Sequence, residues 1–190
     1  MRVIGGERKG RRLIVPKGQA VRPTAARVKE SLFNILPHDF TGMKVLDLFA
    51  GTGNLSIEAL SRGAVKAVLV DASARSATAI RENLRRLGLT ARTEIWIAPA
   101  ARALKTLAKR DEKFDMIFLD PPYNQGLLES SLQVLAQGDL LYQSGTVVAE
   151  HSTREAVNSR YRSLVLNDQR RYGDTLLSFF RPEPKTDPDA

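Results

Sequence analysis

The stretch Val45-Leu46-Asp47-Leu48-Phe49-Ala50-Gly51-Thr52-Gly53-Asn54 is an apolar run that passes directly into a glycine turn. This pattern predicts a buried strand, a tight turn and the start of a helix. In open α/β sheets a ligand binds at the carboxyl end of such a strand. Glycine lets the backbone approach a ligand closely, and the first helical turn offers free N–H donors. We therefore expect a nucleoside pocket lined by Phe49, Ala50, Gly51 and Gly53.

Two carboxylates accompany this turn. Asp47, near the end of the expected strand, would lie close to a cationic ligand, such as a sulfonium that carries an amino-acid tail. Asp71 closes the next expected strand, 18 residues after Gly53, and is suited to accept hydrogen bonds from two ribose hydroxyls. Ser56 stands where a dinucleotide fingerprint has its third glycine, which argues against a nicotinamide cofactor. The alternative is that the glycines only form a turn and that Asp71 caps the following helix.

Strand and helix patterns alternate along the middle of the chain. Strands are expected at 44–48, 67–70, 93–97, 116–119 and 146–149, and helices at 54–61, 73–87, 99–108 and 127–136. Two further strands at 162–166 and 175–180 indicate an antiparallel hairpin at the sheet edge. The expected fold class is α/β, with a mostly parallel sheet and a C-terminal antiparallel hairpin.

Shorter patterns flank this alternation. Residues 3–4 and 12–15 predict a small N-terminal β-ribbon, and 24–36 predict an amphipathic helix with Thr24 as N-cap and Pro37 as the stop. The last nine residues hold three prolines and no apolar periodicity. We expect a basic ribbon over 1–23, one main domain over 24–181 and a frayed tail over 182–190.

The net charge of +8 is concentrated at the N-terminus. Residues 1–30 contain nine Lys or Arg residues against Glu7 and Glu30 only. Because glycines and apolar residues are interleaved with these cations, the segment is expected to be folded and to present a basic face to nucleic-acid phosphates. The alternative is a solvated, highly charged end.

The remaining composition excludes several classes of site. The 190 residues include no cysteine, and the two histidines, His38 and His151, cannot build a metal site alone. No stretch is apolar for long enough to span a bilayer. We expect a cytoplasmic monomer with neither a metal nor a membrane as partner.

A second motif, Asp120-Pro121-Pro122-Tyr123, follows the apolar run 114–119 and should reach the same sheet edge as the glycine turn. The exocyclic amine of a base is a poor nucleophile because its lone pair is delocalised into the ring. Hydrogen bonds to the Asp120 carboxylate and the Pro121 carbonyl would aim that lone pair at a methyl donor. Prolines fix the backbone and have no N–H, and Tyr123 can stack on a flipped-out base. The motif predicts amine methylation with S-adenosylmethionine as donor, and its alternative is a simple strand-ending turn.

With these motifs assembled, nearly the whole chain resembles the bacterial 16S ribosomal RNA guanine-N2 methyltransferases. The stretches that carry the resemblance are Arg2-Val3-Ile4-Gly5-Gly6 with Lys9-Gly10-Arg11; Arg22-Pro23-Thr24 with Arg27-Val28-Lys29-Glu30 and Leu32-Phe33-Asn34; residues 47–53 with 58–64; Asp120 to Tyr123; and Tyr172-Gly173-Asp174-Thr175. The resemblance implies a Rossmann-like class I methyltransferase fold and transfer to guanine N2 in 16S rRNA or the small ribosomal subunit.

The same resemblance implies roles for single residues. Arg22 and Thr24 would lie beside the cofactor and the catalytic pocket, and Ala72 would join Asp71 on the cofactor. The RNA phosphates would be contacted by Lys9, Arg11, Arg12 and Arg27. Surface solvation and helix capping are the alternatives for these residues.

Two positions depart from the family pattern. Ala98-Pro99-Ala100 stands where the family commonly has an acidic residue before Ala, which would meet the adenine amino group. The adenine would instead be held by backbone and by apolar contacts from Pro99 and Ala100. Ala26 also stands where the family usually has Asp.

Three other functions remain open at this point. The Asp-Pro-Pro-Tyr motif is shared with DNA adenine-N6 methyltransferases, so it identifies a reaction and leaves the substrate open. A non-catalytic RNA-binding protein on the same scaffold would explain the altered adenine site. A nicotinamide-dependent oxidoreductase would need the missing third glycine.

Overall fold

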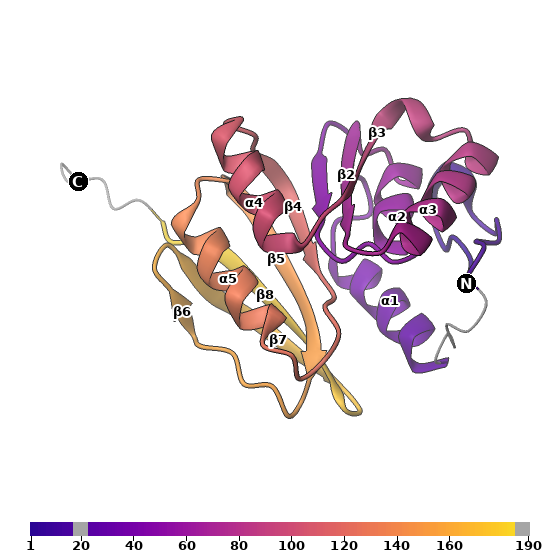
Figure 1. The fold of residues 1–190 in the computed structure, drawn as a ribbon. Helices are drawn as coiled ribbons and strands as arrows, with labels where there is room; N and C mark the ends of the chain where they lie inside the picture. Colours follow the sequence, from indigo (N-terminus) through magenta and orange to yellow (C-terminus); the bar gives the residue numbers. More distant parts are fainter. Residues whose placement is uncertain (17–22, 185–190) are drawn as a thin grey trace.

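The computed structural model describes residues 1–16 and 23–184, which form one eight-stranded sheet with helices on both faces (Figure 1). The strands are β1 (Lys44–Asp47), β2 (Lys66–Asp71), β3 (Thr93–Ile97), β4 (Phe114–Leu119), β5 (Leu141–Ser152), β6 (Arg160–Tyr161), β7 (Leu164–Tyr172) and β8 (Thr175–Pro182). The helices are α1 (Pro23–Ile35), α2 (Asn54–Ser61), α3 (Ala74–Leu87), α4 (Ala100–Lys109) and α5 (Leu127–Gln137), with short 3-10 turns η1 (Gly6–Arg8) and η2 (Thr90–Arg92). The predicted α/β class is confirmed.

The strand order reverses in the middle of the sheet. The order is β3-β2-β1-β4-β5-β8-β7-β6, and β1 to β5 run parallel. Because β1 pairs with β2 on one side and with β4 on the other, the connections after β1 and β4 leave in different directions and open a crevice. The glycine turn and the Asp120–Tyr123 corner both follow strands that end at this crevice.

Two layers of helices bury the two faces of the sheet. Figure 1 shows α1, α2 and α3 on one face and α4 and α5 on the other. Side chains alternate along β1, so Val45 joins the core beneath α1 to α3 whereas Leu46 packs with residues of α4 and α5. In the part of the chain that the structure describes, no helix has the length and apolarity needed to cross a bilayer.

The C-terminal hairpin is confirmed but is longer than its sequence pattern indicates. β5 begins at Leu141 and ends at Ser152, where only 146–149 was expected, and β7 replaces an expected strand at 162–166. The additional residues of β7, 167–172, are mostly exposed and polar, and antiparallel pairing with β8 orders them rather than an apolar pattern of their own. In β5, Glu150 to Ser152 pair with β8, whereas Leu141 pairs with Phe114 of β4. The start of the expected tail belongs to the sheet, because β8 includes Pro182 and the Glu183 N–H donates to the Ser163 carbonyl at 2.7 Å. The rest of it, 185–190, lies outside the described residues.

The N-terminal ribbon is reduced to a single antiparallel bridge between Arg2 and Arg12. Its apolar side chains nevertheless join the core of the domain, since Val3 and Leu13 are both buried. Backbone hydrogen bonds reinforce this packing. The Ile4 N–H donates to Glu58 at 2.9 Å, and the Ile14 backbone and the Asn83 side-chain amide exchange two hydrogen bonds. The segment is thus docked on α2 and α3.

One of the nine N-terminal cations is not available to a partner. Lys29 is only 5% exposed, and its ammonium group forms an ion pair with the buried Glu58 at 2.9 Å. It also donates to Asn54 Oδ1 at 2.7 Å and to the Arg2 carbonyl, while Arg62 pairs with the other Glu58 oxygen at 3.0 Å. The expectation that the whole basic segment faces a ligand is therefore corrected at Lys29, because a buried charge needs a partner of opposite sign.

Candidate active site

The glycine turn after β1 has the backbone that its sequence predicts. Gly51 and Gly53 have φ values of +55° and +78°, in the left-handed region that glycine adopts without strain. A Cβ on Gly53 would also come within 3.2 Å of Leu69 Cδ2, whereas a Cβ on Gly51 would meet no neighbouring atom closer than 4.0 Å. Gly53 therefore serves packing at the start of α2, and Gly51 borders open space where a ligand can reach the backbone.

Asp71 hydrogen-bonds to both the loop after β1 and the loop after β2. One carboxylate oxygen accepts the Gly51 N–H and the other accepts the Ser73 N–H, each at 2.8 Å. Each oxygen retains a lone pair for a further donor. The hydrogen bond from Gly51 shows that Asp71 shapes the glycine turn, and Ala72 beside it is exposed. The alternative that Asp71 caps the following helix holds in part, because Asp71 accepts the N–H of Ser73, which is the N-cap residue of α3.

Asp47 is a buried carboxyl group with unused bonding capacity. It is 1% exposed, and Ser56 Oγ donates to Oδ2 at 3.0 Å. Oδ1 has no hydrogen-bond partner within the described residues. Burial raises the pKa of Asp47 to about 7, with the hydrogen bond from Ser56 acting in the opposite direction. Ser56, which occupies the position of the third fingerprint glycine, thus binds one oxygen of this carboxyl group. A cationic ligand could donate a hydrogen bond to the other oxygen.

The loop after β3 presents apolar surface where the family pattern has a carboxylate. Pro99 is exposed and Ala100, the first residue of α4, is partly buried. Ile97, at the end of β3, is 50% exposed, a feature that the sequence did not single out. The Ala98 N–H donates to the Asp71 carbonyl at 3.1 Å, which joins this loop to the end of β2.

The Asp120–Tyr123 corner lies one strand away from the glycine turn. Leu48 N–H donates to the Phe118 carbonyl at 3.1 Å, so the residues that follow β1 and β4 leave the sheet side by side. Asp120 is exposed and Pro121 is buried. The Tyr123 hydroxyl donates to Glu150 Oε1 at 3.1 Å, and burial together with the Glu150 charge raises the pKa of this phenol.

Contacts from distant parts of the chain hold this corner. Asn124 has a φ of +59°, and its N–H donates to Glu155 Oε1 at 2.7 Å. Thr175, at the end of the 172–175 stretch, hydrogen-bonds to Tyr123 and opposes the rise in its pKa. Glu150 and Glu155 were not predicted as site residues. For Glu150, the available signal was its position near the end of a strand expected to lie next to β4, from which a carboxylate could reach the corner.

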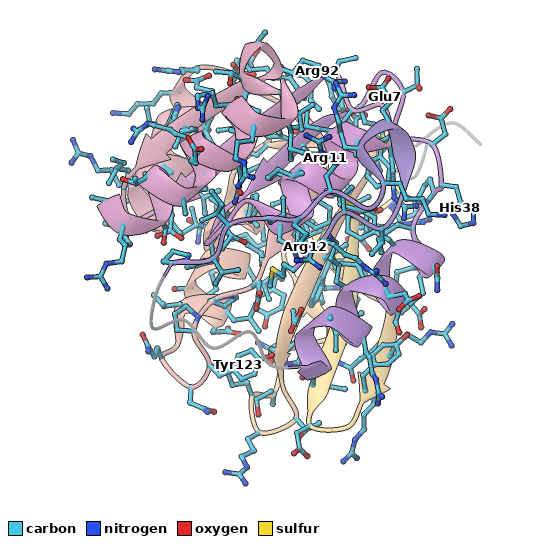
Figure 2. All side chains as sticks on the ribbon, turned by 90° about the vertical axis from the view of Figure 1, so that its right-hand side faces the viewer. Glu7, Arg11, Arg12, His38, Arg92 and Tyr123 are labelled. Atoms are coloured by element: carbon cyan, nitrogen blue, oxygen red, sulfur yellow. The ribbon has the colours of Figure 1, made fainter. Side chains whose placement is uncertain are left out.

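The cations that the resemblance assigns to RNA are solvent-accessible. Lys9, Arg11, Arg12 and Arg27 are all exposed, and none of them forms an ion pair with another residue in 1–16 or 23–184. Figure 2 looks onto the side of the molecule where Arg11 and Arg12 are seen, with Tyr123 nearer its lower edge. Arg11, Arg12 and Tyr123 can thus be seen in the same view of the molecule.

Two expected cofactor residues are not placed. Arg22 lies outside the described residues, as does the side chain of Thr24. α1 begins at Pro23, so Thr24 is its second residue. The prediction that Thr24 is the N-cap of this helix is therefore wrong.

Comparison with known proteins gives consistent matches over the whole chain. The family model described as conserved hypothetical protein 95 matches residues 1–181. A Bacillus subtilis (strain 168) protein with the provisional name rRNA methyltransferase YlbH is 39% identical over 95% of this chain and 98% of its own. The Escherichia coli (strain K12) ribosomal RNA small subunit methyltransferase D is 30% identical over 100% of this chain and 94% of its own.

A solved structure extends the likeness to three dimensions. The Escherichia coli structure provisionally named methyltransferase yhhF has a TM-score of 0.83 at 27% identity, covering 96% of this chain and 98% of that one. The chain therefore belongs to the conserved hypothetical protein 95 family, together with the proteins named ribosomal RNA small subunit methyltransferase D.

Proposed function

We propose that this protein transfers the methyl group of S-adenosylmethionine to the exocyclic N2 amine of a guanine in 16S rRNA, in the small ribosomal subunit. The observation that carries the proposal is the position of the Asp120–Tyr123 corner directly beside the glycine turn. Neighbouring strands lie about 5 Å apart. A base held at the corner and a nucleoside held at the turn would therefore meet.

The residues after β1 and β2 fit this cofactor. Asp47 Oδ1 is a buried acceptor that has no partner among residues 1–16 and 23–184, and it is suited to the cationic amine of the amino-acid tail. Asp71 retains lone pairs for the ribose hydroxyls, and Gly51 leaves room for close approach. Pro99 and Ala100 would hold the adenine through apolar contact. When bound, S-adenosylmethionine supplies a methyl group activated by a positively charged sulfur.

The corner orients the amine that receives the methyl group. The Asp120 carboxylate and the Pro121 carbonyl would accept hydrogen bonds from its two N–H groups, which turns the nitrogen lone pair out of conjugation with the ring and toward the glycine turn. As the nitrogen becomes methylated, Asp120 accepts the proton that the amine loses. Tyr123, fixed by Glu150, offers its ring to the flipped base. Positioning of the two reactants supplies most of the acceleration in such a transfer.

The assignment of rRNA as the substrate rests on other observations than the assignment of the reaction. Relatives are named as rRNA methyltransferases, one of them of the small subunit. Lys9, Arg11, Arg12 and Arg27 offer exposed positive charge for phosphates. The choice of guanine N2 rests on the family resemblance carried by 1–30 and by 172–175.

The test is transfer of labelled methyl to rRNA or to 30S particles from cells that lack the modification. We expect label on N2 of a guanine after nuclease digestion and chromatography. Label on adenine, label only on DNA, or no transfer would refute the proposal.

The corner itself is tested with Asp120→Ala. This variant should lose transfer and keep its affinity for S-adenosylhomocysteine in calorimetry, because Asp120 is assigned to the base and not to the cofactor. Asp139→Ala, an exposed aspartate on the connection between α5 and β5, is the matched control and should keep both. Equal loss of binding and transfer in Asp120→Ala would instead make Asp120 a structural or cofactor residue.

A further inference from the structure

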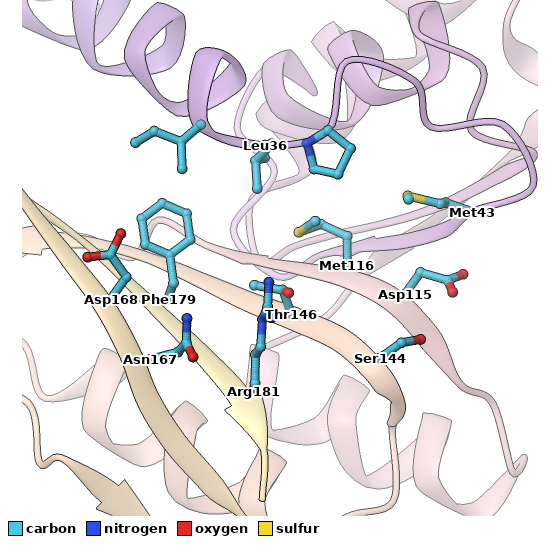
Figure 3. A pocket seen from close by; sticks show the side chains of 12 residues that line it. Leu36, Met43, Asp115, Met116, Ser144, Thr146, Asn167, Asp168, Phe179 and Arg181 are labelled. Carbon is cyan, nitrogen blue, oxygen red and sulfur yellow. The ribbon is translucent and has the colours of Figure 1, made fainter. Parts of the chain in front are cut away.

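A second cavity lies away from the crevice. It has a volume of about 310 Å³ and is enclosed between the C-terminal end of α1 and the sheet (Figure 3). Leu36 lies on one side of the cavity, and Met116 and Phe179 lie across from it on the sheet. Pro37 also lines the cavity. A volume near 300 Å³ with an apolar lining is at the lower end of the range for small-molecule sites.

The cavity shares a face of the sheet with the catalytic corner. Thr146 lines the cavity and Glu150 binds Tyr123, and these residues are four apart on β5, so their side chains project to the same side. Met116 and Asp120 are likewise four apart along the chain from β4. At about 3.3 Å per residue, the cavity lies roughly 13 Å from the corner. A strand of RNA with its target base at the corner spans this distance with a few nucleotides.

Both irregularities of the sheet register border this cavity. The pairing of β7 with β8 shifts between Leu166 and Asp168, which leaves Asn167 as an extra residue beside the cavity. The pairing of β4 with β5 shifts between Phe114 and Met116, and Ser144 on the longer strand also lines the cavity. Bulges redirect side chains and are common next to binding sites.

The polar groups of the cavity include donors that the protein itself does not use. Among the described residues, the Arg181 guanidinium and the Asn167 amide form no hydrogen bond or ion pair. Figure 3 shows Arg181 rising from β8 next to Thr146. The two carboxylates of the lining are already engaged, since Asp168 pairs with Arg170 at 2.9 Å and Asp115 accepts the N–H of Lys44 at 2.8 Å.

We propose that this cavity binds a nucleotide of the substrate RNA other than the target base. An apolar wall accepts the face of a base, and the Asn167 amide can both donate to and accept from its edge. The Arg181 guanidinium suits the phosphate. The identity of the polymer as RNA rests on the proposed function, whereas the nucleotide chemistry rests on the cavity.

Methionine methyl groups provide separate reporters for the two sites. The chain has three methionines, of which Met43 and Met116 line the cavity, while the Met1 sulfur accepts a hydrogen bond from Thr52 in the glycine turn. In the full chain labelled with ¹³C-methyl methionine, GMP should shift the Met43 and Met116 signals in NMR spectra. S-adenosylhomocysteine should shift Met1. Met43→Leu and Met116→Leu assign the signals.

Charge removal tests the contact with phosphate. Arg181→Gln should raise the dissociation constant of GMP roughly tenfold, the typical effect of losing a hydrogen bond to a charged group. Arg162→Gln, which removes the same charge from the turn between β6 and β7 and does not line the cavity, should leave it unchanged. An unlabelled 16S rRNA fragment should displace GMP and produce shifts at the same two methionines.

Several outcomes would overturn the proposal. These are no shift of Met43 and Met116, equal shifts with inorganic phosphate alone, an unaffected Arg181→Gln variant, or shifts with GMP that the RNA fragment neither reproduces nor competes away. The last outcome would indicate a site for free nucleotides. Failure of methyl transfer with intact responses at Met43 and Met116 would refute the proposed function and leave the cavity assignment standing.

Discussion

The affinity of the protein for its cofactor should depend on pH through Asp47. The carboxyl group is buried, its pKa is raised to about 7, and one of its oxygens has no hydrogen-bond partner in the described part of the chain. A ligand with a cationic amine binds the ionised form, so the proton must leave first. With a pKa of about 7, the dissociation constant is multiplied by roughly 11 at pH 6, 2 at pH 7 and 1.1 at pH 8. Binding should therefore weaken about tenfold between pH 8 and pH 6.

Isothermal titration calorimetry with S-adenosylhomocysteine measures this directly. Repeating the titration at pH 6 in buffers of different ionisation enthalpy should show release of about 0.9 proton, the protonated fraction of a group with a pKa of about 7. Asp47→Asn should bind more weakly and show no pH dependence over this range. A flat affinity of the unmodified protein from pH 6 to pH 8, or an unchanged dependence in Asp47→Asn, would refute the reasoning.

The same carboxyl group affects the ligand-free protein in a predictable direction. Its pKa is higher in the folded chain than the value of 3.8 for a free aspartate, so the folded state holds the proton more tightly. The protonated carboxyl group makes its full contribution to the stability of the folded state below pH 3.8, and this contribution is lost as the pH rises through about 7. Asp47 thus lowers stability at neutral pH, and a cationic ligand offsets this effect.

Two further predictions follow from the charges near the N-terminus. Lys29→Met should lower the free energy of unfolding by about 3–5 kcal/mol in urea titrations, because it leaves Glu58 buried with one partner fewer, whereas the exposed Lys105→Met should change it by less than about 0.5 kcal/mol. A loss below about 1 kcal/mol for Lys29→Met would contradict this assignment. The double variant Arg11→Gln and Arg12→Gln should reduce the slope of log affinity for RNA against log salt by about 1.5–2 and leave S-adenosylhomocysteine binding intact. An unchanged slope would remove these two residues from the RNA surface.

Features with a local signal could be predicted from the sequence. α2 has the expected bounds, and α3 begins one residue after the expected start, because Ser73 is its N-cap. α3 ends at Leu87, as expected, and is followed by Gly88 as C-cap with a φ of +68°, which is common at helix C-termini. The left-handed Gly51 and Gly53 are of the same kind, because a turn of this geometry selects glycine directly.

Features that depend on distant pairing could not be predicted. Glu150 and Thr175 reach Tyr123 only because β5 and β8 pair in one particular antiparallel register. Neither residue carries a local pattern that indicates this. Lys29 was misjudged for a related reason: a lysine in a basic segment resembles a surface residue until α2 brings Glu58 against it.

The docking of the N-terminal segment restricts how this enzyme could be retargeted. Val3 and Leu13 lie in the core of the domain, and Ile4 and Ile14 are hydrogen-bonded to α2 and α3. In a chimera that exchanged residues 1–16 alone, the new segment would no longer match the residues of α2 and α3 that it packs on, so the chimera should fold poorly. To exchange RNA specificity between relatives, the graft would have to carry Glu58 and Asn83 with it, because these two side chains hydrogen-bond to the segment.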